Sequence, residues 1–420
     1  MPKMKAGKER NVLLTVFVTI FLDLLGFGII IPILPFYAQQ FGASAPAVTW
    51  LGASYSLMQL IFAPFWGRLS DRYGRRPIML VSIAASIVGY GLFALATDLT
   101  MLFAARLLAG FGNANIATAQ AAIADTTTPQ TRARGMGLIG AAFGLGFIVG
   151  PAAGGLLGQI SPSAPAWLAT GLAAINLLMA YFLFHETLPE QHRGQVRARV
   201  SWSRVLSIPA LTSVLMVNLL LTSGFSMIEQ TLALLIEAVW VSGDGVGTAG
   251  LASGSPEAWR LGAARTAQYL LFVGITSSIV QGGLLGGLTR RFGEKRLIGA
   301  GLLLILVGFV LISVVSRVST FGVFMVTAVL LAAGTGLSTP SLSGLISKLS
   351  PPDIQGRALG LGQSASALGR VIGPGISGYL FEVGIRVPFE TAAVIVGVAF
   401  AALLAVPADA GQSAPQELSR

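Results

Sequence analysis

Residues 67–76 read Gly-Arg-Leu-Ser-Asp-Arg-Tyr-Gly-Arg-Arg and lie between two long apolar segments. Four arginines and one aspartate therefore occupy a short turn between two stretches that are each long enough to cross a membrane. Lys and Arg gather in the cytoplasmic loops of membrane proteins. The stretch thus predicts that the chain crosses a membrane and that this turn lies on the cytoplasmic side.

The composition of the whole chain supports a membrane protein. Charged residues make up only 10% of the 420 residues, while apolar residues reach 54%. Soluble proteins carry about 25% charged residues, so two or three soluble domains are excluded. The chain also holds 52 glycines, which let membrane helices pack closely. We expect an all-α protein embedded in the lipid bilayer.

The net charge of +10 is unevenly distributed along the chain. Twenty of the 27 Lys and Arg fall in six groups, and all six lie on one side of an alternating topology. Those groups are Lys3–Arg10, Arg68–Arg76, Arg132 with Arg134, Arg193–Arg204, Arg290–Arg296, and Lys348 with Arg357. This asymmetry indicates orientation in a cell membrane and argues against a nucleic-acid partner.

Twelve apolar stretches are long enough to cross a bilayer, which takes about 20 residues. They span 11–37, 48–67, 77–97, 100–123, 135–160, 165–184, 209–240, 263–289, 296–316, 320–348, 356–382 and 387–406. An even count places both termini on one side, and the basic start of the chain makes that side cytoplasmic. A polar, basic linker then divides the helices six and six. The expected units are a six-helix bundle over 1–184, a linker over 185–208, a second bundle over 209–406, and a cytoplasmic tail over 407–420.

An internal repeat crosses the linker. Gly67-x-Leu69 recurs as Gly286-x-Leu288, Gly150-Pro151 recurs as Gly373-Pro374, and Gly135-x-Gly137 recurs as Gly360-x-Gly362. The separations of 219, 223 and 225 residues are nearly constant, which indicates duplication of a six-helix unit. Transporters built from two such halves bind substrate near the bilayer midplane between them.

The charged turn also resembles the signature loop between helices 2 and 3 of the major facilitator superfamily. The resemblance implies a twelve-helix fold of two six-helix bundles. In that family the aspartate of the loop lies near the start of helix 11 when the cytoplasmic side is closed. The implied conformational gate consists of Gly67, Asp71, Arg72, Gly74, Arg75 and Arg76, with Asp125 after helix 4 as a partner for one of the arginines.

Two further stretches resemble the drug:proton antiporter branch of the same superfamily, which includes tetracycline exporters. Gly140–Gly155 is similar to the helix 5 motif of proton-linked exporters, and Leu102–Asn113 is similar to the helix 4 motif with Arg106. Small residues about four apart expose a groove for a neighbouring helix. The packing residues expected there are Gly146, Gly150, Pro151 and Gly154.

Ionisable residues inside the predicted helices are candidates for mechanism, because each costs about 2.5–3.5 kcal/mol to insert. Asp23 lies 12 residues into the first span, about 18 Å deep at 1.5 Å per residue. Such a carboxyl group could exchange protons, or it could be a structural aspartate. Glu229 with Gln230 is the second proton-carrier candidate, whereas Glu237 is expected in solvent. Arg106 and Arg370 are the buried cations, and Asn113 adds a polar contact.

The expected function is secondary transport of a small amphipathic molecule or drug, exported in exchange for protons. A proton symporter or facilitator for a sugar, organic anion or other metabolite is the alternative, followed by a non-transporting receptor or scaffold. We expect no enzyme and no cofactor, because the only two histidines lie in the linker and leave no buried catalytic base. The absence of a phosphate-binding loop argues against transport driven by ATP. A metal site is not expected either, because the chain has no cysteine and only two histidines. The protein is expected to act as a monomer.

Overall fold

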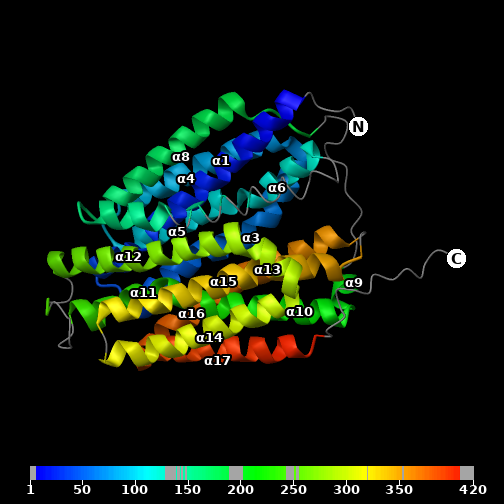
Figure 1. Cartoon of the computed structure of the whole chain (residues 1–420). Coiled ribbons are helices and arrows are strands. Elements are labelled where there is room, and N and C mark those ends of the chain that lie inside the picture. The colour runs from blue at the N-terminus through cyan, green and yellow to red at the C-terminus, as the bar shows by residue number, and fades with distance from the viewer. Residues whose placement is uncertain are drawn as a thin grey trace.

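The computed structural model describes residues 6–127, 149–188, 202–242, 255–318, 320–351 and 354–406, with a few single residues between them. This described part is helical and contains no strand (Figure 1). The helices of the first half are α1 (Ala6–Ile30), α2 (Leu34–Gln40), α3 (Ala45–Tyr73), α4 (Arg75–Ala94), α5 (Leu99–Gly112), α6 (Ile116–Thr126) and α8 (Ala164–Leu183). A 3₁₀ turn, η1 (Asn113–Asn115), joins α5 to α6.

The second half begins with the short helix α9 (Trp202–Leu206), which lies inside the expected linker. It continues with α10 (Pro209–Ser226), α11 (Ile228–Ile236), α12 (Pro256–Ile279), α13 (Leu285–Phe292), α14 (Glu294–Val318), α15 (Phe321–Leu349), α16 (Gln355–Val383) and α17 (Val387–Leu404). Two π-helical turns, η3 (Glu237–Val241) and η4 (Val280–Leu284), follow α11 and α12.

Eight helical runs in the described part are long and apolar enough to cross a membrane. Helices α3 and α16 are 29 residues each, which is also sufficient in length, but they are not among those eight. Eleven of the twelve expected spans coincide with described helices. The remaining one, 135–160, is described continuously only from Val149 on.

Several spans that the sequence predicts as continuous are broken. The first span is interrupted at Ile31–Ile33, where Pro32 removes a backbone donor. The fourth span breaks at η1, where Ala114 has the non-helical angles φ −76° and ψ 15°. The eighth span changes to π-helix at η4, and its first helix begins at Pro256 rather than at residue 263. At such irregular turns inside membrane helices, side chains point in directions that a regular helix would not give them.

Two groups of helices make up the molecule. The largest apolar core draws only on residues between Val205 and Val406, whereas two further cores are built mainly from residues between Val12 and Phe184. Helices α3 and α16 pack against each other where the groups meet. In Figure 1 the blue and cyan helices diverge from the yellow and red helices toward the end at which α1 begins and α17 ends.

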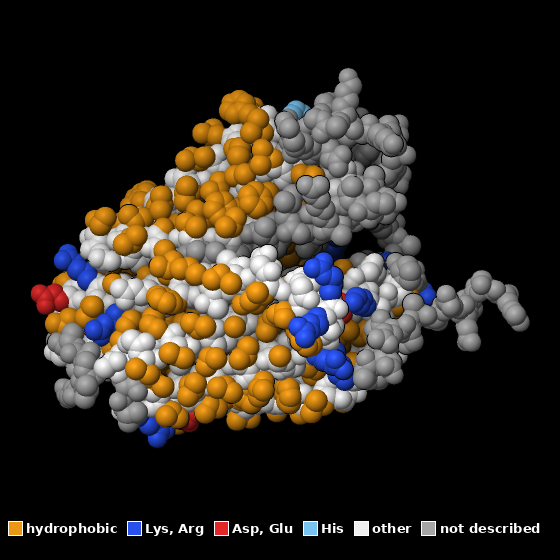
Figure 2. Space-filling model, viewed as in Figure 1, with side chains coloured by type: hydrophobic (Ala, Val, Ile, Leu, Met, Phe, Trp, Pro, Cys, Tyr) orange, Lys and Arg blue, Asp and Glu red, His pale blue; other side chains and the backbone are white. Residues whose placement is uncertain are grey.

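The outer surface suits a lipid environment. Figure 2 shows apolar side chains over the flanks of the helices, while Lys and Arg gather toward the ends of the bundle. Phe182, for example, is 71% exposed on α8 and Val383 is 79% exposed on α16. Contact with lipid tails removes the cost that such exposure would have in water.

The two ends of the bundle differ in packing. We call the end where α3 meets α4 and α13 meets α14 the basic end, and the opposite end the far end. At the far end a Cβ atom added to Gly262 would lie 2.6 Å from the Phe36 ring, and one added to Gly378 would lie 2.5 Å from the Cα of Pro46. At the basic end, a Cβ added to Gly286 or Gly287 would meet no atom of the described residues within 4 Å. The two groups are therefore tightly packed at the far end, whereas α13 buries none of its residues.

Candidate functional site

Asp23 lies inside α1 and is only 7% exposed. Its Oδ2 accepts a hydrogen bond of 2.9 Å from Nδ2 of Asn115. The same Nδ2 donates to the Ser82 hydroxyl of α4 at 3.2 Å. A carboxyl group this deep among helices is an expensive feature to keep, so its hydrogen-bond partners matter for any role it has.

The 3₁₀ turn η1 directs two asparagines to different partners. Asn115 bonds Asp23 of α1 and Ser82 of α4, whereas Asn113, which is 2% exposed, bonds other residues of α4. Nδ2 of Asn113 donates to the Tyr90 hydroxyl at 3.0 Å, and its Oδ1 accepts from the Ser86 hydroxyl at 3.3 Å. The Tyr90 hydroxyl also lies beside α1, because a Cβ on Gly26 would be only 2.9 Å from it.

Arg106 of α5 is 2% exposed and is held between aromatic rings. Its guanidinium carbon lies 4.5 Å from the ring centre of Tyr55 and 5.7 Å from that of Phe27. The Arg106 Nε donates to the Leu51 carbonyl at 3.4 Å, while Nη1 has no hydrogen-bond partner in the described part of the chain. Tyr55 interacts electrostatically with Tyr90, which accepts from Asn113, so this arginine is connected with the asparagine turn.

Glu229, Gln230 and Arg370 come from the second half and face this cluster. Glu229, in the first turn of α11, and Arg370, on α16, are both partly exposed. The carboxyl group of Glu229 interacts electrostatically with Arg370 of its own half and with Arg106 of the first half. Gln230 is 2% exposed and presses on α3, where a Cβ added to Gly52 would lie 2.9 Å from its Cγ.

The loop between α3 and α4 is organised by Arg75, which is 1% exposed. Its Nη1 lies 2.7 Å from Asp71 Oδ1 and donates to the Ser70 hydroxyl at 2.7 Å. Its Nε lies 3.0 Å from Oδ2 of Asp125 on α6. Asp71 is 47% exposed and pairs within its own half. Arg72 lies over the ring of Tyr73, 5.3 Å from its centre, and Gly67 lies in the basic-end part of α3.

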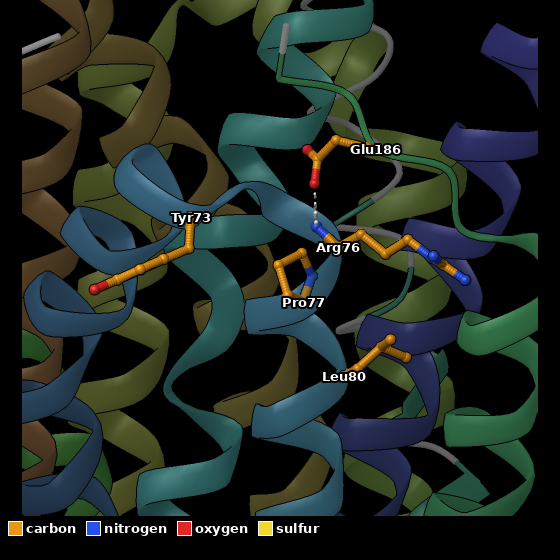
Figure 3. Close-up of a pocket in the computed structure, with 5 residues that line it drawn as sticks. All are labelled: Tyr73, Arg76, Pro77, Leu80 and Glu186. Carbon is orange, nitrogen blue, oxygen red and sulfur yellow. Dashed lines mark hydrogen bonds between the residues drawn. The ribbon is translucent and has the colours of Figure 1, made fainter. Parts of the chain in front are cut away.

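Glu186 holds this loop from the end of the first half. Its Oε1 accepts from the backbone N–H of Arg75 at 2.9 Å, and its Oε2 accepts from that of Arg76 at 3.2 Å. The carboxylate therefore caps the start of α4, which favours negative charge. Figure 3 shows it pointing at the backbone of Arg76 beside a cavity of about 290 Å³ that Tyr73, Pro77 and Leu80 also line.

Gly74 is required here for two reasons. Its φ of 106° is open to glycine and rarely to other residues, and a Cβ at this position would collide with Oε2 of Glu186. The Arg76 side chain runs away from the carboxylate and donates from Nη2 to the Tyr181 carbonyl at 2.6 Å. The loop is thus tied to α6, to α8 and to the residues that follow α8.

The glycines expected on helix 5 lie against α1. A Cβ on Gly146 would be 2.8 Å from the Leu24 Cβ, and one on Gly150 would be 2.8 Å from the Gly28 Cα. Pro151 also faces Gly28, and Gly154 faces the Ile29 carbonyl. Close approach of two backbones explains the small residues.

Sequence reasoning missed several residues of the central cluster. Tyr90 and Ser82 give no signal in the sequence, because a tyrosine or serine in an apolar helix is common. Glu186 follows α8 in a polar stretch, and only the folded chain brings it to the start of α4. Glu237, expected in solvent, is instead 4% exposed in η3. No cluster of three or more His, Asp or Glu side chains suited to a metal ion occurs among the residues described.

Comparisons with known proteins identify the relatives of this chain. The family model for the Major Facilitator Superfamily matches residues 16–256 and 247–419. Tetracycline resistance protein, class C, of Escherichia coli is 33% identical over 372 residues, which covers 87% of this chain and 89% of that protein. Multidrug resistance protein 1 of Bacillus subtilis (strain 168) is 27% identical over 407 residues, covering 96% and 98%.

Solved structures show the same fold at lower identity. The human organic anion transporter MFSD10 superposes with a TM-score of 0.68 at 24% identity, covering 94% of this chain and 99% of that one. The nucleoside transporter NupG gives a TM-score of 0.74 at 14% identity, again covering 94% and 99%. These likenesses confirm the expected fold.

Proposed function

The chain belongs to the major facilitator superfamily of membrane transporters, and from this premise we propose that it exports a small amphipathic drug in exchange for protons. The family makes it a transporter rather than an enzyme. Export of a drug is supported by the tetracycline resistance and multidrug resistance proteins that it resembles along most of its length. The observation that supports proton exchange is the buried carboxyl group of Asp23. This side chain projects from α1 and accepts a hydrogen bond from Asn115.

The described conformation corresponds in this proposal to the state open to the cytoplasm. The far end is closed by contacts such as Gly378 with Pro46, whereas α13 at the basic end contains no buried residue. The bias of Lys and Arg supports a cytoplasmic location for the basic end and for both termini. The two expected bundles, 1–184 and 209–406, would rock about the packed centre as single units, each protein acting as a monomer.

Two carboxyl groups divide the work in this cycle. Asp23 receives a proton when the bundle is open to the outside and releases it to the cytoplasm. Glu229 interacts electrostatically with Arg106 of the other half as well as with Arg370 of its own, so its charge draws the halves together. Neutralising Glu229 by a proton weakens that attraction, which favours separation of the halves at the centre.

The loop at Gly67–Arg76 is the gate at the cytoplasmic side. In the open state Asp71 pairs with Arg75 of its own half. When the basic end closes, Asp71 moves onto the start of α16, where free backbone N–H groups favour a carboxylate. The buried pair of Arg75 with Asp125 stays in place and keeps the loop rigid in both states.

A flux measurement tests the proposal. The purified protein is placed in liposomes with an imposed pH gradient, and tetracycline is the first probe in a panel of amphipathic drugs, sugars and organic anions. Antiport predicts that a drug accumulates in the compartment from which protons leave. Asp23→Asn is expected to abolish gradient-driven transport while leaving the protein folded. Flux of a sugar or anion in the same direction as protons would contradict export and support symport.

A further inference from the structure

We propose that Asn115 serves both protonation states of Asp23, donating its amide N–H to the carboxylate and offering its amide oxygen to the protonated carboxyl group. This inference rests on the proposed function, in which Asp23 carries the proton. It assigns a positioning role to a residue that touches neither a drug nor bulk water.

A buried carboxyl group that changes protonation state has conflicting needs. The ionised form accepts hydrogen bonds only, whereas the protonated form must also donate one. A buried polar group left without a partner costs about 1–3 kcal/mol. At 7% exposure, Asp23 has little access to water, so a neighbouring side chain has to meet both needs.

The geometry around Asn115 meets them. Its side chain is 0% exposed, and Nδ2 donates to Asp23 at 2.9 Å and to the Ser82 hydroxyl at 3.2 Å. Its Oδ1 is buried and has no hydrogen-bond partner in the described part of the chain. This arrangement suits an ionised Asp23 and leaves one acceptor unused.

Rotation of the amide by half a turn uses that acceptor. Oδ1 then takes the place of Nδ2 and accepts the O–H of a protonated Asp23. In this structure the Ser82 hydroxyl donates to the Met79 carbonyl at 2.8 Å and accepts from Nδ2. After the rotation it follows the exchange by turning its single O–H from that carbonyl to Oδ1. A leucine, which has the same branching and no polar atom, can do neither.

The helix break at η1 positions Asn115 for this contact and links it to further side chains. The turn η1 directs Asn115 toward Asp23 and Asn113 toward Tyr90. Among the described residues, the titratable side chains that interact electrostatically with Asp23 are Tyr90 of α4 and Tyr55 of α3. The guanidinium of Arg106 lies over the ring of Tyr55. Asp23 and Arg106 are thus connected through η1 and the two tyrosines.

The experiment compares two buried asparagines that both contact α1. Asn115→Leu removes the partner of Asp23. Asn176→Leu is the matched control, because Asn176 is also 0% exposed and bonds Thr19 on α1 at 3.0 Å rather than Asp23. If leucine at residue 115 prevents folding, Asn115→Ala removes the same amide without adding bulk.

Infrared difference spectra of the purified protein in lipid, recorded across a pH titration, read the carboxyl C=O band directly and need no drug. The band assigned to Asp23 is the one lost in Asp23→Asn. We expect Asn115→Leu to move this band to the position of a carboxyl group without hydrogen bonds, and Asn176→Leu to leave it unchanged. An unmoved band in Asn115→Leu overturns the inference. Absence of any such band in the unaltered protein rejects Asp23 as the carrier and so rejects the proposed function instead.

Transport supplies a second reading. With tetracycline as the probe, Asn115→Leu is expected to lower gradient-driven flux about tenfold, as expected for loss of one hydrogen bond to a charged group. Drug exchange without a gradient should fall far less, because it requires no net proton movement. An equal fall in both activities would indicate a merely structural asparagine.

In the double variant Asp23→Asn with Asn115→Asp, the carboxyl group moves to the facing side chain, and partial return of gradient-driven flux is expected.

Discussion

The loop between α3 and α4 and its repeat between α13 and α14 begin from similar sequences and have different environments. Both turns contain a glycine with positive φ, Gly74 at 106° and Gly293 at 77°. In the first loop Arg75 is buried between two carboxylates and Glu186 covers the start of α4. In the second loop Arg290 replaces the aspartate, and α13 buries none of its residues.

The helices that lead into the two loops also differ, because only the first is continuous. Helix α3 runs without interruption from Ala45 to Tyr73, whereas the corresponding run is broken at η4. The start of α4 is capped by Glu186 from a distant part of the chain, while α14 begins with its own acidic residue, Glu294. Duplication thus preserved the backbone turn, and only one copy acquired a buried charge network. The first loop is therefore tied by buried charges, whereas the second has only partly exposed contacts such as the pair of Glu294 with Lys348.

The largest difference is expected for the arginines. Arg75→Ala leaves Asp71 and the mostly buried Asp125 without a cation, and we expect a loss of about 3 kcal/mol in stability. Arg291→Ala, at the exposed second loop, is expected to cost less than about 0.5 kcal/mol. Thermal unfolding of the two variants in detergent measures this difference. Equal shifts would show that burial of Arg75 contributes nothing.

The two glycines give the next largest difference. Alanine at either position meets the strain of positive φ, which costs about 1–3 kcal/mol. At Gly74 the new Cβ also displaces Glu186, whereas at Gly293 a Cβ would meet no atom within 4 Å in the described part of the chain. Gly74→Ala should therefore lower the unfolding temperature more than Gly293→Ala. Combining Gly74→Ala with Glu186→Ala should cost less than the sum of the two single changes.

A smaller effect is expected for the acidic residues at the helix starts. Glu186→Gln keeps one acceptor oxygen but loses the negative charge at the start of α4, for a loss of about 1–2 kcal/mol. Glu294→Gln removes an ion pair to Lys348, whose side chain is 52% exposed, and should cost about 0.5 kcal/mol or less. High salt should reduce the effect of Glu294→Gln more than that of Glu186→Gln. Unfolding at two salt concentrations checks this order.

The smallest effect is expected for Arg290→Asp, which restores in the second loop the aspartate of the first. Arg290 is exposed, so stability should change by less than about 0.5 kcal/mol. Because the chain contains no native cysteine, single thiols can be placed at either end without prior changes. Labelling at the basic end should be almost the same with and without Arg290→Asp. A clear change would mean that the second loop also acts as a gate.

The sequence was sufficient for the broad architecture and for part of the candidate site. Asp23 and Arg106 stand out because a charged residue inside an apolar stretch is costly and visible in the sequence. Asn115 is visible only as one of several asparagines that could add a polar contact, and Tyr90 and Ser82 do not stand out, because uncharged polar residues are common in membrane helices. Their importance depends on η1, a local break that apolar periodicity does not reveal. The role of Glu186 depends on a contact between residues 110 positions apart.

Apolar length, the placement of Lys and Arg, and the repeated glycines were enough to determine a membrane-embedded, duplicated helical protein. These properties are local, since each span must satisfy the bilayer by itself. Only the tertiary structure decided which polar groups meet: Asn115 with Asp23, Glu186 with the start of α4, and Arg75 with Asp125. Such pairings depend on how helices distant in the chain pack and where they break. In a medium without water, each buried polar group must find its partner in that packing.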